Sequence, residues 1–253
     1  MKELMFSLVL LISCLAMVAC GGGSGGVAGP DDIGGDCSCD EAVATEQGGS
    51  CKVDMSQLGA GHMKMPLIFS KGVKGCEAVA KRAGDGEAVG CMTDITLDSG
   101  SGEQMLMKFG EGYCVKGAIK ATFSGADAED SKVKPITDSM LELLNAGKTD
   151  KIVLCPRGSI LMHIDNTQTI AGKVEGKDVG LKLNLLSKIC VRRCESDTEC
   201  RGDAGYSCSP VSPFHGKGGF EFYPSGVEGD VEIGDARLCI NKKNMAELKS
   251  TKP

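Results

Sequence analysis

Residues 180–186 read GLKLNLL, and within this stretch apolar and polar side chains alternate. A period of two places every second side chain on the same face of a β-strand, which predicts a strand at this position. Further apolar runs lie before it along the chain, separated by glycine-containing turns. They read QMLMKF at 104–109, YCVKGAIKATF at 113–123, KIVLC at 151–155 and SILMHI at 159–164. We therefore expect residues 37–188 to form a body that is mainly β.

Two segments of this body favour short helices instead of strands. The stretch ITDSMLELLNAG at 136–147 has apolar residues at helical spacing, with Thr137 or Asp138 as the expected N-cap and Gly147 past the end. The stretch CEAVAKRAG at 76–84 is a second and shorter helical candidate. The predicted fold class is thus mainly β with one or two short helices.

The cysteines predict a disulfide-rich protein. Twelve of the 14 cysteines follow residue 36, and an even number in an exported chain indicates a framework of up to six bridges. No two cysteines have the spacing of a thioredoxin-type site, and His62, His163 and His215 are scattered singly, so disulfides are favoured over redox or zinc sites. Twelve cysteines allow on the order of 10⁴ pairings, so the connectivity does not follow from the spacing. The candidates are Cys37, Cys39, Cys51, Cys76, Cys91, Cys114, Cys155, Cys190, Cys194, Cys200, Cys208 and Cys239.

The composition changes in the last quarter of the chain. CVRRCESDTECRGDAGYSC at 190–208 holds four cysteines, and Cys239 follows after an excursion of about 30 residues. This pattern resembles the small cysteine-rich modules at the ends of exported myxobacterial-type lipoproteins, a resemblance that implies no activity. We assign residues 189–253 to such a module. Because five cysteines cannot all pair with one another, we expect one bond into the body, to Cys155.

Aromatic residues gather in this module. Five of the ten aromatic residues of the chain lie between Tyr206 and Tyr223. Phe220 and Phe222 alternate, so they share one face of a strand. They form either the core of the module or, with Phe214 and Tyr223, a surface for a partner, because aromatic residues are enriched at the centres of interfaces.

The N-terminus has the features of an export signal. From Leu4 to Ala19 the chain carries no charge, and this run behind Lys2 is too short to cross a bilayer. The stretch MVAC at 17–20 resembles the lipobox of bacterial lipoproteins. In that family the cysteine, here Cys20, receives a diacylglyceryl group and the signal is cut just before it.

The resemblance to the lipoproteins implies both a topology and a location. Residues 1–19 are then the signal peptide, and residues 20–36 are the lipidated cysteine with a flexible Gly/Ser tether. The protein is expected in a bacterial cell envelope, held to a membrane through Cys20 and facing the periplasm or the exterior. Its partner there is an unknown envelope protein or ligand. A plain secreted protein is the alternative, but pairing of Cys20 would leave an odd number of cysteines.

The charge of the chain bears on its partners. Its net charge is −6 and no basic cluster occurs, which argues against nucleic acid as a partner. We expect no cofactor. Residues 201–203 read RGD, as integrin-binding loops do, but so short a motif arises readily by chance.

The chain contains no catalytic motif, so a binding or structural role is expected rather than an enzyme. One alternative is a hydrolase whose site is assembled from distant residues, such as His163 and Asp165. Another is a copper-binding protein, because His62, Met63 and Met65 offer one imidazole and two thioethers. We expect these methionines to pack inward from an exposed turn.

Overall fold

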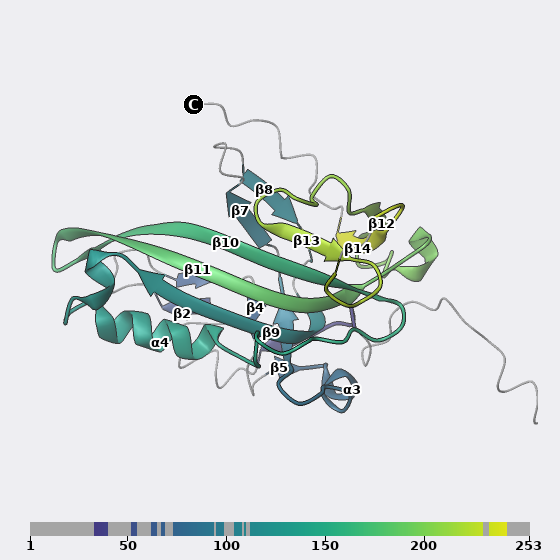
Figure 1. Ribbon diagram of the computed structural model, residues 1–253, viewed down its shortest axis with the longest axis horizontal. Helices are drawn as coiled ribbons and strands as arrows, with labels where there is room; N and C mark the ends of the chain where they lie inside the picture. The colour runs from purple at the N-terminus through teal and green to yellow at the C-terminus, as the bar shows by residue number, and fades with distance from the viewer. Residues whose placement is uncertain are drawn as a thin grey trace, which may run out of the picture.

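The computed structural model describes residues 33–39, 52–54, 62–64, 67–68, 73–93, 95–98, 104–107, 109, 112–229 and 233–241. Its centre is a six-stranded antiparallel sheet with the order β13-β10-β11-β9-β6-β4 (Figure 1). The strands are β4 (Leu67–Ile68), β6 (Ala88–Met92), β9 (Tyr113–Ser124), β10 (Ser159–Val174), β11 (Lys177–Arg192) and β13 (Phe220–Tyr223). The prediction of a mainly β fold is confirmed.

Four further antiparallel strand pairs surround this sheet in the described part of the chain. They are β1 (Ser38–Cys39) with β5 (Val73–Lys74), β2 (Lys52–Asp54) with β3 (His62–Lys64), β7 (Ile95–Asp98) with β8 (Gln104–Met107), and β12 (Tyr206–Pro210) with β14 (Arg237–Asn241). The helices are α3 (Glu77–Ala80), α4 (Lys134–Leu144) and the 3₁₀ turns η2 (Ala126–Glu129) and η3 (Asp197–Glu199). None of these helices is long and apolar enough to span a membrane.

The β10–β11 hairpin is the longest feature of the sheet, and it pairs without interruption from Ser159 with Arg192 to Val174 with Lys177. Glu175 and Gly176 form its two-residue turn, and both have positive φ angles (50° and 79°). Positive φ at both positions matches the twist of the two strands, and glycine adopts it without strain. The apolar runs predicted only parts of these strands, because the outer half of β10 is largely polar and alternates between exposed and half-buried residues.

The two faces of the sheet are covered by different parts of the chain. One face carries the main core, which also includes residues of the C-terminal module. Farther along the same face, α4 packs over β9 and β11 (Figure 1). The opposite face buries a smaller apolar cluster that holds the N-terminal segment and α3 against the sheet. Its aliphatic members are Ile33, Val79, Ala118, Val153 and Leu161.

Helix α4 differs from its prediction at both ends. It begins at Lys134, ahead of both expected N-caps, because Pro135 lacks an N–H group and suits the first turn. Neither predicted N-cap serves as one, since the Thr137 hydroxyl instead donates to the carbonyl of Lys134. The helix ends at Leu144, and the Asn145 side chain then accepts a hydrogen bond from the N–H of Ala121 on β9.

The predicted strand KIVLC at 151–155 is wrong. Val153 is buried, whereas Ile152 and Leu154 are 72% and 59% exposed. The N–H groups of Leu154 and Cys155 donate to the Glu87 carboxylate and to the carbonyl of Gly226, so no ladder forms. The apolar run is real, but the segment lies along the protein without a strand partner among the described residues.

The boundary expected between residues 188 and 189 falls within β11, which runs to Arg192 without a break. The module in turn supplies β13, which pairs with β10 at the edge of the sheet. Phe220 and Phe222 share one face of β13, as expected, and are fully buried in the main core. These two residues are therefore core residues and are not available as a contact surface.

Among the side chains that the structure describes, five disulfide bonds join ten of the candidate cysteines. They are Cys37–Cys91, Cys76–Cys114, Cys155–Cys190, Cys194–Cys208 and Cys200–Cys239. The expected bond from the module into the body is present as Cys155–Cys190. The side chain of Cys39 and the whole of Cys51 lie outside the described residues.

Candidate functional site

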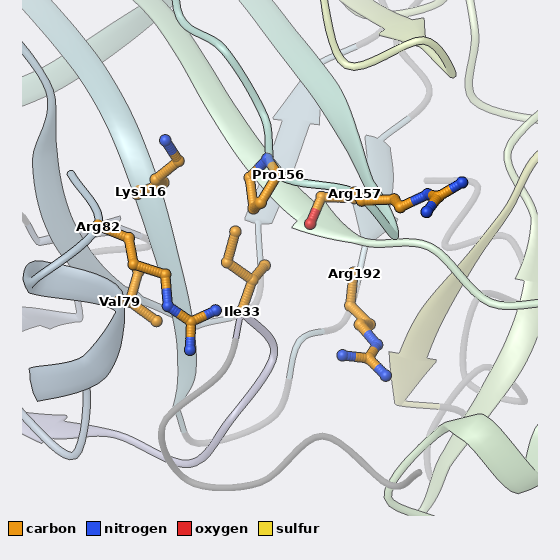
Figure 2. A pocket seen from close by; sticks show the side chains of 8 residues that line it. Ile33, Val79, Arg82, Lys116, Pro156, Arg157 and Arg192 are labelled. Carbon is orange, nitrogen blue, oxygen red and sulfur yellow. The ribbon is translucent and has the colours of Figure 1, made fainter. Parts of the chain in front are cut away.

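A small cavity of about 50 Å³ lies on the face of the sheet opposite the main core (Figure 2). Three strands of the sheet line it from below with Lys116 on β9, Ser159 on β10 and Arg192 on β11. Ser159 and Arg192 are direct cross-strand partners, and they form the first pair of the β10–β11 ladder. The cavity therefore sits where β10 begins and β11 ends.

The sides of the cavity come from three segments that pack on this face. Val79 and Arg82 belong to α3 and the turn after it, Ile33 to the N-terminal segment, and Pro156 and Arg157 to the loop before β10. We call these eight lining residues the arginine pocket.

Two disulfide bonds fix the sides of the arginine pocket to the strands below it. Cys76–Cys114 ties the start of α3 to β9, and Cys155–Cys190 ties the loop before β10 to β11. The N-terminal segment is held by backbone hydrogen bonds, because Gly34 donates to and Gly35 accepts from Cys114. The pocket is thus built from segments that are distant in the sequence but are firmly joined to the sheet.

The lining of the arginine pocket is cationic, with three arginines, one lysine and no acidic residue. Lys116 is neutralised, since its ammonium group lies 2.7 Å from the Glu87 carboxylate and both side chains are only 7% exposed. The same carboxylate accepts hydrogen bonds from the N–H groups of Gly84 and Leu154. Lys116 and Glu87 therefore form a neutral pair, and the three arginines are the remaining cationic residues of the lining.

Tyr113 supports the pocket from the other face of β9. Its hydroxyl oxygen accepts a hydrogen bond of 2.9 Å from the N–H of Arg192, and its ring packs edge-on against Phe109. Burial raises the pKa of Tyr113 far above its ordinary value of 10.0. The phenol is therefore neutral at physiological pH and is not a general base.

His163 and Asp165, the residues of the hydrolase alternative, both lie on β10. His163 is flanked across the strands by Glu221, whose carboxylate is 3.6 Å from the imidazole Nδ1, and by Lys188. Within the described part of the chain, neither imidazole nitrogen is hydrogen-bonded to a hydroxyl or a thiol. The buried Ser187 belongs to the other face of the sheet, because it directly precedes Lys188 on β11. Among the described residues, no serine or cysteine is therefore hydrogen-bonded to this histidine as a nucleophile.

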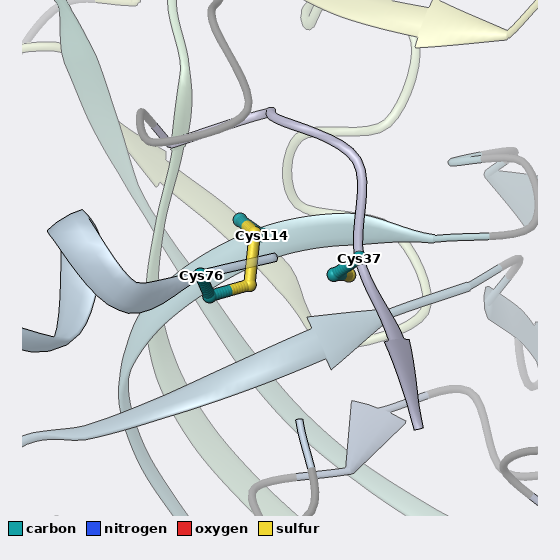
Figure 3. Close-up of side chains that lie close together, drawn as sticks. All are labelled: Cys37, Cys76 and Cys114. Atoms are coloured by element: carbon teal, nitrogen blue, oxygen red, sulfur yellow. A yellow bond between two sulfur atoms is a disulfide. The ribbon is translucent and has the colours of Figure 1, made fainter. Parts of the chain in front are cut away.

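Among the described residues, two groups of sulfur atoms lie close together, each with its three sulfurs within 4.8 Å of one another. Figure 3 shows the first, in which the Cys76–Cys114 bond lies beside Cys37. The second comprises Cys194, Cys200 and Cys239. A metal would need thiolates, whereas all six sulfurs are in disulfide bonds. We interpret both groups as adjacent disulfides.

The other predicted site residues are scattered over the molecule. Phe214 and Tyr223 are half-buried, and the Tyr223 hydroxyl donates to the Glu221 carboxylate at 2.6 Å. Partner contact by these two residues stays a prediction. His62 and Met63 lie on β3, and Met65 follows it, but the side chains of these copper candidates lie outside the described residues. Cys20 also lies outside them.

The RGD interpretation fails for a structural reason. Arg201 is buried, with an ion pair to Asp36 and a hydrogen bond of 3.2 Å to the carbonyl of Gly112. Its guanidinium group also lies 4.3 Å from the centre of the Tyr206 ring. An integrin-binding arginine must be free to reach a partner, whereas Arg201 is held within the fold.

Sequence reasoning missed the arginine pocket, although the sequence contains a signal for it. Three of its cations occur two residues after a disulfide cysteine, in the stretches CVK at 114–116, CPR at 155–157 and CVR at 190–192. Residues i and i+2 of a strand share a face. On β9 and β11, a cysteine whose side chain lies on the pocket face of the sheet therefore places the cation two residues later on the same face.

Comparison of the chain with protein families, with curated proteins and with solved structures gives no match.

Proposed function

We propose that this protein is a lipid-anchored component of a bacterial cell envelope that acts by binding or as a structural element, without catalysis. The observation that carries the proposal is the pairing of ten cysteines as disulfides behind the MVAC stretch at 17–20. Disulfides persist in oxidising compartments outside the cytoplasm and are rare within it. An export signal that ends in a cysteine then accounts for how the chain reaches such a compartment.

The cysteine count supports lipidation of Cys20 in particular. Twelve cysteines remain once Cys14 leaves with the signal and Cys20 carries lipid, and an even number can pair completely. A diacylglyceryl group together with an acylated amino terminus gives two or more chains, which suffice for stable anchoring. The Gly/Ser-rich residues after Cys20 would let the folded part move away from the membrane surface.

The test is the Cys20→Ser substitution in the full-length chain, expressed in a bacterium with a lipoprotein pathway. We expect the variant to lose incorporation of labelled fatty acid and either to remain unprocessed or to leave the membrane fraction. Cys14→Ser is the matched control, because it also removes a signal-peptide thiol but should leave labelling and fractionation unchanged. A Cys20→Ser protein that is cut and retained like the wild type would contradict the proposal.

The hydrolase and copper alternatives are separable by measurement. Metal analysis of the purified protein after loading with copper tests His62, Met63 and Met65, since binding there should be lost in a His62→Ala variant. A hydrolase should turn over generic ester substrates and lose that activity on His163→Ala.

A further inference from the structure

We propose that the arginine pocket binds a phosphate-type oxyanion, held by the side chains of Arg82 and Arg192, with Arg157 adding positive charge nearby. This inference goes beyond the envelope role and does not depend on the lipid anchor, because it concerns only the folded part of the chain. Figure 2 shows the guanidinium groups of Arg82 and Arg192 flanking Ile33 and extending in the same direction, whereas that of Arg157 extends away from the other two.

The chemistry of the lining selects an anion with several acceptor atoms. A guanidinium group presents its N–H donors in a planar fork that matches phosphate and carboxylate oxygens. Ser159 adds a hydroxyl, which donates or accepts, beside Arg192 at the base of the cavity. Three arginines and one hydroxyl suit a tetrahedral group with several oxygens and more than one charge better than a single carboxylate.

The size of the cavity limits what enters it. About 50 Å³ of space accommodates roughly four water-sized positions, at about 10–15 Å³ each. A phosphate group fits this space, whereas a nucleoside or a sugar ring would have to remain outside. The apolar Ile33, Val79 and Pro156 close the other sides and lower the local polarity, which strengthens the attraction between opposite charges.

The charge of the pocket stands out against the rest of the chain. The protein carries a net charge of −6, yet none of the eight lining residues is acidic. Arg82 and Arg192 also interact with other parts of the chain. We therefore infer anion binding from the positive charge of the lining and not from unused hydrogen-bond donors. Because two disulfides fix the backbone of the walls, only side chains need to rearrange when the ligand binds.

The experiment is isothermal titration of the purified full-length mature protein, in detergent, with inorganic phosphate at low ionic strength. Arg82→Gln should weaken phosphate binding about tenfold or more, and Arg157→Gln should weaken it less, because the Arg157 guanidinium extends away from those of Arg82 and Arg192. Both side chains are exposed, so neither change should affect folding, and thermal melting checks this. Arg193→Gln is the matched control, since Arg193 is the exposed arginine next to Arg192 but does not line the pocket.

A second titration, with glycerol 3-phosphate, distinguishes two sources of the same ligand chemistry. Equal binding of phosphate and its monoester supports a pocket open to the phosphate of a larger molecule, such as a lipid headgroup. Binding of inorganic phosphate alone supports a site for the free ion. The proposal is overturned if neither ligand binds at about 10 mM, or if the Arg82→Gln and Arg157→Gln variants bind phosphate as tightly as the wild type.

Discussion

Cys91 on β6 and Cys114 on β9 are direct cross-strand partners, yet they are not bonded to each other. Cys91 bonds to Cys37 and Cys114 to Cys76, so each bond reaches out of the sheet to a segment that packs on it. A bond between the two partners would join strands that the hydrogen-bond ladder already holds together. Bonds to Cys37 and Cys76 instead fasten the N-terminal segment and α3, which have few ladder hydrogen bonds of their own.

The first prediction concerns this pairing. The same relationship recurs on β12 and β14, where Cys208 faces Cys239 but bonds to Cys194. Proteolysis of the unreduced protein followed by mass spectrometry should yield peptides linked through Cys37–Cys91 and Cys194–Cys208. Peptides linked through Cys91–Cys114 or Cys208–Cys239 would show that the neighbouring pairs bond directly, contrary to the structure.

The second prediction concerns the stability that individual bridges contribute. A disulfide stabilises the fold by lowering the conformational entropy of the unfolded chain, and more so for a longer loop. On this basis the Cys155–Cys190 bond, whose sequence separation is 35, contributes about 4 kcal/mol of stability. The Cys194–Cys208 bond, whose separation is 14, contributes about 3 kcal/mol. Replacing both cysteines of a pair by alanine should lower the free energy of unfolding in that order, as measured by denaturant titration. A larger loss of stability on removal of Cys194–Cys208 would mean that packing in the folded state, rather than loop closure in the unfolded chain, sets the contribution of these bonds.

The third prediction concerns β13. Phe220 and Phe222 are buried and their rings stack at 6.0 Å, so replacing either by alanine should cost about 3–5 kcal/mol of stability. Glu221 between them points to the other face and is half-exposed, so Glu221→Gln should change stability little. If Phe222→Ala melted like the wild type, the core assignment of this strand would be wrong.

Sequence patterns predicted the parts of the fold where local signals and final packing agree. The run YCVKGAIKATF became β9, and the alternation of Phe220 and Phe222 became one buried face of β13. A similar apolar run failed as a signal at Ile152 and Leu154, because such a run does not say whether a partner strand is present. Sequence patterns also missed the outer half of β10, where pairing with β11 holds a polar segment extended.

The arginine pocket was harder to predict, because its residues meet only through tertiary structure. Arg82, Arg157 and Arg192 are 75 and 35 residues apart in sequence, and no short motif contains two of them. The disulfide pairing brings them together, and that pairing does not follow from cysteine spacing. The cation two residues after each of Cys114, Cys155 and Cys190 became informative only once the bonds were known.

The fourth prediction concerns the buried ion pair under the pocket. Glu87→Gln removes the charge that neutralises Lys116 and leaves a buried ammonium group unpaired, which should cost about 3–5 kcal/mol. Lys116→Met should cost less, because the Glu87 carboxylate keeps its hydrogen bonds from Gly84 and Leu154. Denaturant titration of the two variants compares these losses. The reverse order would show that Lys116, rather than Glu87, organises this region.

The last prediction concerns the response of the fold to alkaline pH. Burial raises the pKa of Tyr113 in the folded state, so the unfolded chain loses this proton first, near pH 10. The stability that the neutral phenol contributes is present below about pH 10 and falls above it, by about 1.4 kcal/mol at about pH 11. Tyr113→Phe removes this dependence, although it also costs about 1–3 kcal/mol at neutral pH because the N–H of Arg192 loses its acceptor.

The measurement is the free energy of unfolding of both proteins at about pH 8, 10 and 11. The gap between the wild type and Tyr113→Phe should narrow as the pH rises, since only the wild type loses the contribution of this phenol. Tyr223→Phe is the control, because Tyr223 is half-buried and its hydroxyl donates to an exposed carboxylate, so it should not narrow the gap in the same way. A gap between the wild type and Tyr113→Phe that stays constant from pH 8 to about pH 11 would mean that Tyr113 ionises in the folded protein as readily as in the unfolded chain, and that its burial in the core is wrong.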